Sequence, residues 1–281
     1  MLATFVIGLR EGLEAALIVG IVAGFLRRRG DRAALRPMWA GVALAVVICI
    51  VVAVVLEVIS ADLPQQEQEG LETVIGLVAV GMITYMIVWM RKHARSMRGE
   101  LEAAAESALA KGSTWALVAM AFLAVLREGF ETTVFLLAAF QSSTSPIAAG
   151  GGAALGVLVA VGLGYGIYRG SVHIDLARFF TITAVFLVLV AAGLFVSAVH
   201  TAHEATWINV GQTQVADLSA IVQPGTPISS LLTGVLGIQP QPTVIEVVAW
   251  LIYLVPMLVF VLWPARRPTR SSASSPVDAP A

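Results

Sequence analysis

The segments REGLE, residues 10–14, and REGFE, residues 127–131, repeat one five-residue phrase inside two long apolar runs of the chain. Each phrase places an arginine and two glutamates where a hydrophobic helix would otherwise cross a membrane. Charged side chains at membrane depth are costly, and they usually mark an ion or substrate path. The repeated phrase therefore predicts a membrane protein with an internal ionic site.

The composition of the 281-residue chain agrees with this prediction. Hydrophobic residues make up 58% and charged residues 12%, about half of the roughly 25% charged share of soluble domains. The formal net charge of −1 gives no general attraction to nucleic acid, so no nucleic-acid partner is expected. The single cysteine excludes a disulfide framework and a thiolate metal site.

Seven segments have the length of about 20 mostly apolar residues that a transmembrane helix needs. They predict an all-α integral membrane protein with seven transmembrane helices, at roughly residues 2–26, 38–59, 72–90, 115–140, 147–168, 179–199 and 244–263. The membrane domain would occupy residues 1–263. Residues 264–281 are rich in Pro, Ser and Ala, which predicts a disordered cytoplasmic tail.

Lysine and arginine are unevenly distributed among the connections. Outside the two phrases, all of them lie after the first, third or fifth predicted span or in the tail. Cytoplasmic loops carry such an excess, so we expect the N-terminus outside the cell and the C-terminus in the cytoplasm. The expected location is a plasma membrane, with lipid around the spans.

The two phrases lie in the first and fourth spans and therefore run in opposite directions. Spans 1–3, about residues 2–90, and spans 4–6, about residues 115–199, predict an inverted repeat, to which the seventh span at 244–263 is added. Such repeats commonly place a substrate site at their interface near the middle of the membrane.

Helical spacing brings the charged groups of each phrase to one face, because positions three and four apart are neighbours on a helix. Carboxylate oxygens suit hard cations, and iron sites in helix bundles use Glu from facing helices. The expected metal ligands are Glu11, Glu14, Glu128 and Glu131, and the expected counter-ions are Arg10 and Arg127. The alternative is a salt-bridge network that only fixes the helix register.

Two further groups are candidates for an outer iron site. Glu69 and Glu72 open the third span, and His200, His203 and Glu204 follow the sixth. Acids at a helix N-terminus are also stabilised by the helix dipole without further function. The histidines are equally expected as solvated loop residues.

Small and sulfur-containing residues add two further expectations. Gly12 and Gly129 would allow close helix approach, or leave room for an ion and its waters. Met82, Met86 and Met90 repeat at a spacing of four in the third span, which is typical of packing, although thioethers also suit Cu(I).

The paired phrase resembles the motif of the oxidase-dependent iron transporter family, which includes fungal high-affinity iron permeases and bacterial ferrous iron permeases. This family has a duplicated Arg-Glu-Gly-x-Glu motif in its first and fourth spans, and both copies are intact here. The resemblance covers nearly the whole membrane region, because similarity continues at residues 69–70, 84–90, 204–207 and 242–246.

The resemblance implies a seven-span iron permease whose motif glutamates handle Fe²⁺ or Fe³⁺ as the transported substrate. It implies no enzymatic activity and no permanently bound cofactor. It also implies a periplasmic partner, which would be an oxidase, a haem peroxidase or a metal-binding protein. The short loops fit a bacterial inner-membrane protein better than a fungal one.

Carboxylates alone leave other functions open. The chain could transport another divalent cation such as Mn²⁺, or act as a proton-coupled carrier. An intramembrane di-iron enzyme is a third alternative, but helix-bundle sites of that kind generally also use Glu-x-x-His. Every His of this chain lies outside the predicted spans or at an end.

Overall fold

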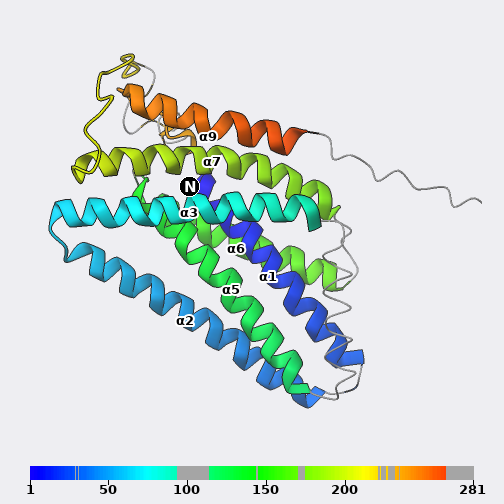
Figure 1. The fold of residues 1–281 in the computed structure, drawn as a ribbon. Coiled ribbons are helices and arrows are strands. Elements are labelled where there is room, and N and C mark those ends of the chain that lie inside the picture. Colours follow the sequence, from blue (N-terminus) through cyan, green and yellow to red (C-terminus); the bar gives the residue numbers. More distant parts are fainter. Residues whose placement is uncertain are drawn as a thin grey trace, which may run out of the picture.

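A computed structural model describes residues 1–28, 30, 32–93, 114–143, 145–169, 175–220, 222, 226, 232, 233 and 235–263. This part of the chain is all-helical, which confirms the predicted fold class (Figure 1). The long helices are α1 (Leu2–Arg28), α2 (Leu35–Ala61), α3 (Gln65–His93), α5 (Thr114–Gln141), α6 (Pro146–Tyr168), α7 (Leu176–Glu204) and α9 (Val244–Leu262), and the short η1 is Arg32–Ala34. The predicted tail at 264–281 lies outside the described residues.

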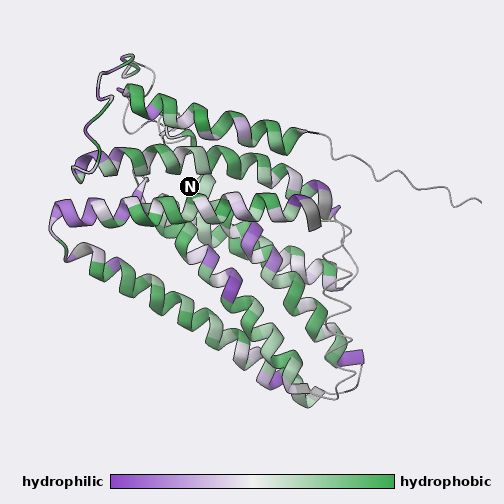
Figure 2. Cartoon of the chain, viewed as in Figure 1, coloured by the Kyte–Doolittle hydropathy of each residue, from purple (hydrophilic) through white to green (hydrophobic). Residues whose placement is uncertain are grey.

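Each long helix coincides with one predicted span. Five of them are long and apolar enough to cross a membrane, and the other two, α1 and α5, carry the charged phrases. Figure 2 shows hydrophilic residues at helix ends and in the middle of α1 and α5, with mostly hydrophobic residues elsewhere along the helices. Large apolar side chains such as Val51, Leu158 and Ile252 are exposed, as a lipid-facing surface requires.

The helices pair across the two predicted repeats. The first helix of each repeat packs on the second helix of the other, giving the pairs α1–α6 and α5–α2, while α1 crosses α5 and α3 packs on α7. Exchanging α1, α2 and α3 with α5, α6 and α7 maps α1–α6 onto α5–α2 and leaves the pairs α1–α5 and α3–α7 unchanged. This symmetry supports the inverted repeat, which stays a prediction together with the orientation in the membrane.

The pair α1–α6 is packed through small residues. A Cβ placed on Gly156 would lie 2.2 Å from the Phe5 carbonyl oxygen, and one on Gly164 would lie 2.6 Å from Ala16 Cβ. Helices in membranes associate largely through such close backbone approach, because lipid removes the usual hydrophobic driving force. These glycines therefore fix α1, and the phrase it carries, tightly against α6.

The third helices and the added α9 form a separate layer. In Figure 1, α9, α7 and α3 lie nearly side by side, whereas α2 and α5 run obliquely to them. α2 and α3 diverge from their short connection and make few contacts afterwards. The space between them is closed mainly by α5, and this divergence leaves room for cavities next to the second phrase.

Candidate cation site

Three of the four expected ligand carboxylates meet between α1 and α5. Oxygens of Glu11, Glu128 and Glu131 all lie within 4.8 Å of one another. In the described part of the chain, this is the one group of three or more His, Cys, Asp or Glu residues close enough to hold a metal ion. Oxygen donors at this spacing suit a hard cation such as Mg²⁺, Mn²⁺ or iron.

The fourth expected ligand, Glu14, lies outside this group. Its Oε1 is 3.1 Å from the Arg10 guanidinium, in the pair four positions apart that the helical spacing predicts. Glu14 is nevertheless close enough to Glu128 for the two charges to interact. It therefore borders the carboxylate group without joining it.

One oxygen of the group has no protein partner. Glu11 is 1% exposed, and its Oε2 is buried without a hydrogen bond, whereas its Oε1 accepts from Arg10 at 2.7 Å. A buried carboxylate oxygen left unpaired is costly, so it calls for an explanation. A cation bound by the three carboxylates would supply one.

Arg10, the first expected counter-ion, is enclosed by protein, with 1% of its side chain exposed. Besides its two glutamates, the guanidinium contacts Met86 Sδ of α3 and lies 5.9 Å from the centroid of the Phe180 ring of α7. The methionine of the third span thus has a packing role beside a charge. Contacts to two further helices make Arg10 a fixed positive charge.

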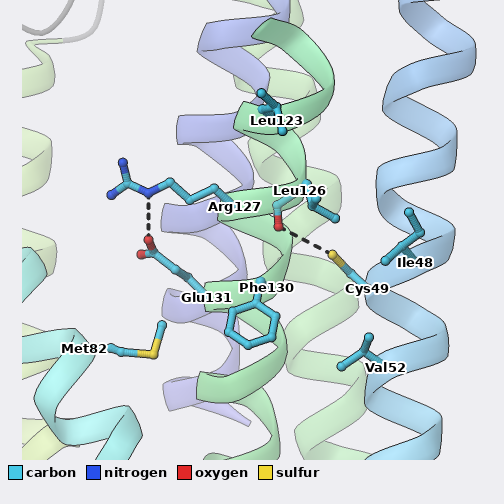
Figure 3. A pocket seen from close by; sticks show the side chains of 9 residues that line it. All are labelled: Ile48, Cys49, Val52, Met82, Leu123, Leu126, Arg127, Phe130 and Glu131. Carbon is cyan, nitrogen blue, oxygen red and sulfur yellow. Dashed lines mark hydrogen bonds and ion pairs between the residues drawn. The ribbon is translucent and has the colours of Figure 1, made fainter. Parts of the chain in front are cut away.

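Arg127, the second expected counter-ion, is far more open, with 58% of its side chain exposed. Its Nε donates to Glu131 Oε1 at 3.0 Å and lies 3.9 Å from Glu128 Oε1. Figure 3 shows Arg127 and Glu131 at the wall of a cavity of about 490 Å³, which also includes Met82 of α3. Arg127 is therefore not enclosed by other helices as Arg10 is.

The two phrase glycines both serve close helix approach. A Cβ on Gly12 would lie 2.9 Å from Ala160 Cβ of α6, and one on Gly129 would lie 2.7 Å from Cys49 Sγ of α2. In each repeat the glycine contacts the second helix of the other repeat. Gly12 and Gly129 also line a second cavity of about 670 Å³ between α1, α2 and α5, which reaches Glu11 and Glu128.

The candidate outer residues form contacts, but not a compact group of ligands. His200 Nδ1 lies 2.8 Å from Glu246 Oε1 of α9, and its Nε2 lies 3.6 Å from Glu204 Oε1. Glu69 lies beside Glu204. The structure therefore joins the ends of α3, α7 and α9 through acid and imidazole groups.

Two of the candidate outer residues are engaged locally. His203 Nδ1 is 2.8 Å from the Ile208 carbonyl oxygen, so it closes the turn after α7. Gln68 Nε2 donates to Glu72 Oε1 at 3.3 Å within α3. Whether any of these residues holds iron stays a prediction.

The sequence predicts Glu246 and Glu57 only as interfacial residues near span ends, and not as members of a site. Glu246 is 3% exposed, accepts from the Thr243 backbone at 2.9 Å and pairs with His200. Its signals in the sequence are its place in the first turn of α9, where a glutamate caps a helix, and the family resemblance of residues 242–246. Glu57 lines the larger cavity near the end of α2, and its signal is a charge in an otherwise apolar segment.

Comparison with known proteins finds one family and several relatives that match nearly the whole chain. Residues 1–267 match the sequence model of the family described as Iron permease FTR1 family. A protein named Ferrous iron permease EfeU from Escherichia coli O6:K15:H31 (strain 536 / UPEC) is 41% identical over 279 residues, which are 98% of this chain and 100% of that protein. The proteins of the same name from Shigella sonnei (strain Ss046) and Yersinia pestis are also 41% identical, over 280 residues (98% of this chain, 100% of that protein) and 281 residues (99% and 98%). No solved structure matches the chain.

Proposed function

The chain belongs to the Iron permease FTR1 family, and on that premise we propose that iron crosses the membrane through the carboxylates of the two phrases. The protein is a multi-pass iron transporter of the bacterial inner membrane, not an enzyme. Glu11, Glu128 and Glu131 would bind the passing ion, with Glu14 beside them. No resident cofactor takes part in this proposal, because iron is the substrate.

The observation that carries the proposal is the meeting of three carboxylates from two different helices, with one buried oxygen of Glu11 unpaired. The group contains no His, which separates it from the Glu-x-x-His pattern of helix-bundle di-iron enzymes. If all are ionised, four glutamates and two arginines leave a surplus of two negative charges, which a divalent ion would balance. The relatives' name, ferrous iron permease, supports Fe²⁺ as that ion.

We further propose an orientation in the membrane, an inverted repeat and a periplasmic partner. The N-terminus faces the periplasm, which the basic connections on the other side support. Spans 1–3 and 4–6 act as inverted repeats, which the pairing of α1 with α6 and of α5 with α2 supports. A periplasmic oxidase, haem peroxidase or metal-binding protein delivers the iron, and the resemblance of the paired phrase supports such a partner.

The test is uptake of radiolabelled Fe²⁺ into proteoliposomes that hold equal amounts of folded protein, under anaerobic conditions. Glu128→Gln keeps the size of the side chain and removes a charged ligand, so uptake should fall about tenfold or more. Glu67→Gln is the matched control, because Glu67 is an exposed acid in the first turn of α3. Parental uptake by Glu128→Gln would overturn the site.

Competition separates the other transport functions from this one. Excess Mn²⁺ should reduce Fe²⁺ uptake less than an equal excess of unlabelled Fe²⁺ does. Equal competition would favour a general divalent cation carrier. Movement of protons into the proteoliposomes in the absence of any metal ion would favour a proton-coupled carrier.

A further inference from the structure

The cavity of about 670 Å³ connects the phrase carboxylates with the end of the molecule where α2 meets α3. At one end it is lined by Glu11 and Glu128, and its lining extends along α2 and α5 as far as Val58 and Phe140. Most of the wall between these ends is apolar. A few polar side chains in an apolar wall make each charge act over a longer distance than it would in water.

Glu57 is the one charged residue between Arg36 and Asp62, in the most apolar of the membrane-spanning helices. Its side chain is exposed and lines this cavity. A carboxylate facing lipid would be costly, and such residues normally face a water-filled space or a partner. A water-filled cavity would give Glu57 such a space.

The register of α2 and α5 gives the distance between Glu57 and the phrase. Gly41 lies beside Phe122, and Cys49 lies beside Gly129, so the two helices run in the same direction. Glu57 comes two turns after Cys49, which is about 12 Å along the axis at 1.5 Å per residue. Glu57 is thus too distant to share one ion with Glu128, and it would form a separate binding position.

Hydroxyl groups occupy the interval between these carboxylates. Thr132 and Thr133 line the cavity, and their Oγ1 atoms donate to the carbonyl oxygens of Glu128 at 2.7 Å and Gly129 at 2.9 Å. A hydroxyl that donates still has lone pairs to offer. Both threonines can therefore accept a hydrogen bond from the water shell of a passing cation.

Negative charge also continues on the other side of Glu57. Glu57 lies close enough to Glu72 of α3 for the two carboxylates to repel each other. Glu72 is likewise repelled by the carboxylate of Glu204. Glu204 is also next to Glu69. Carboxylates thus follow one another from the outer ends of α3 and α7 to the mouth of the cavity.

We propose that this cavity is the entry route of the cation, and that Glu57 is an intermediate carboxylate that collects a hydrated divalent cation before it reaches the phrase carboxylates. The inference rests on the proposed function and adds a path and a residue to it. The route would end at the unpaired Oε2 of Glu11, because this side chain lines the inner end of the cavity. A route lined with one sign of charge raises the local concentration of the opposite ion.

The first test compares Glu57→Gln with Glu67→Gln in Fe²⁺ uptake over a range of concentrations. Removal of the Glu57 charge should raise the half-saturating Fe²⁺ concentration about fivefold and leave the maximal rate nearly unchanged. The reason is that charge lining a cleft raises the rate at which the opposite ion associates. Glu67→Gln should match the parent, since Glu67 does not line the cavity. An unchanged half-saturating concentration in Glu57→Gln would overturn the role of this residue.

The second test asks whether the cavity holds water, using two adjacent valines of α2. In a Cys49→Ala background, Val54→Cys places a thiol in the cavity lining, whereas Val55→Cys places one outside it. The two native side chains have similar exposure, 55% and 48%. A membrane-impermeant, positively charged methanethiosulfonate added from the periplasmic side should modify only Val54→Cys, and Fe²⁺ should slow this reaction.

An unreactive Val54→Cys variant, or equal reaction of both variants, would overturn the route. This reaction needs no transport, so its failure is separate from a failure of the phrase site. Parental uptake by Glu128→Gln would instead count against the proposed function itself.

Discussion

The two copies of the phrase have nearly the same sequence but different surroundings. In the first copy Arg10 is buried, held by two glutamates and in contact with α3 and α7. In the second copy Arg127 is 58% exposed and pairs with Glu131 at the edge of a cavity. The neighbouring helices, not the phrase, therefore decide whether its arginine is enclosed or exposed.

The difference follows from which helices surround each copy. α1 is packed through glycines onto α6 and also touches α7, and the arginine of its phrase is enclosed by protein. The phrase of α5 faces the space where α2 and α3 diverge. Buried ion pairs are costly to break, because one partner is left as an uncompensated charge, whereas exposed pairs contribute little.

The largest expected effect is that of Arg10→Ala. Removal of this side chain leaves Glu11 and Glu14 buried without their cation, so we expect a loss of about 3–5 kcal/mol in unfolding free energy. Unfolding in mixed detergent micelles, followed by circular dichroism, measures this change. A loss no larger than that of Arg127→Ala would contradict the difference between the copies.

An intermediate effect is expected where the glycine of the second phrase meets α2. Gly129→Ala would push a Cβ against Cys49 Sγ, so it should cost about 1–3 kcal/mol in unfolding free energy. Adding Cys49→Ala to this variant removes the sulfur and should recover most of the loss. For the first copy, the matched pair is Gly12→Ala with Ala160→Gly. Absence of rescue in the double variant would mean that these contacts do not set the helix distance.

The smallest effect is expected for Arg127→Ala. Arg127 borders a cavity and is only partly enclosed by protein, so its removal should lower the unfolding free energy by less than the loss of about 3–5 kcal/mol expected for Arg10→Ala. Because salt screens exposed charges, the difference from the parent should shrink further as NaCl is added. A loss of several kcal/mol, or one that salt does not change, would show that Arg127 is as enclosed as Arg10.

The sequence was a good guide to the helices and to contacts within a helix. The apolar run predicted at 147–168 is the helix Pro146–Tyr168, because Ser145 caps it and Pro146 suits its first turn. The pairs Arg10–Glu14 and Arg127–Glu131 were predicted from helical spacing and are present. Local geometry fixes these features, so no knowledge of the fold is needed to find them.

Contacts between helices could not be predicted in the same way. Nothing in the first phrase indicates that Met86 and Phe180 enclose Arg10, since these residues are distant in sequence and meet only through packing. The pairing of His200 with Glu246 depends on how α9 lies on α7. The gathering of Glu11 with Glu128 and Glu131, but not Glu14, likewise depends on the crossing of α1 and α5.

The exchange of helices between the two halves also bears on how the protein is synthesised. The main neighbours of α1 and α2 are α6 and α5, which emerge from the ribosome only after α3 is complete. α2 is apolar enough to stay in lipid alone during this delay. α1 carries an arginine and two glutamates that become enclosed only when its later neighbours arrive. The enclosure of these charged groups is therefore complete only after α6 and α7 have been made.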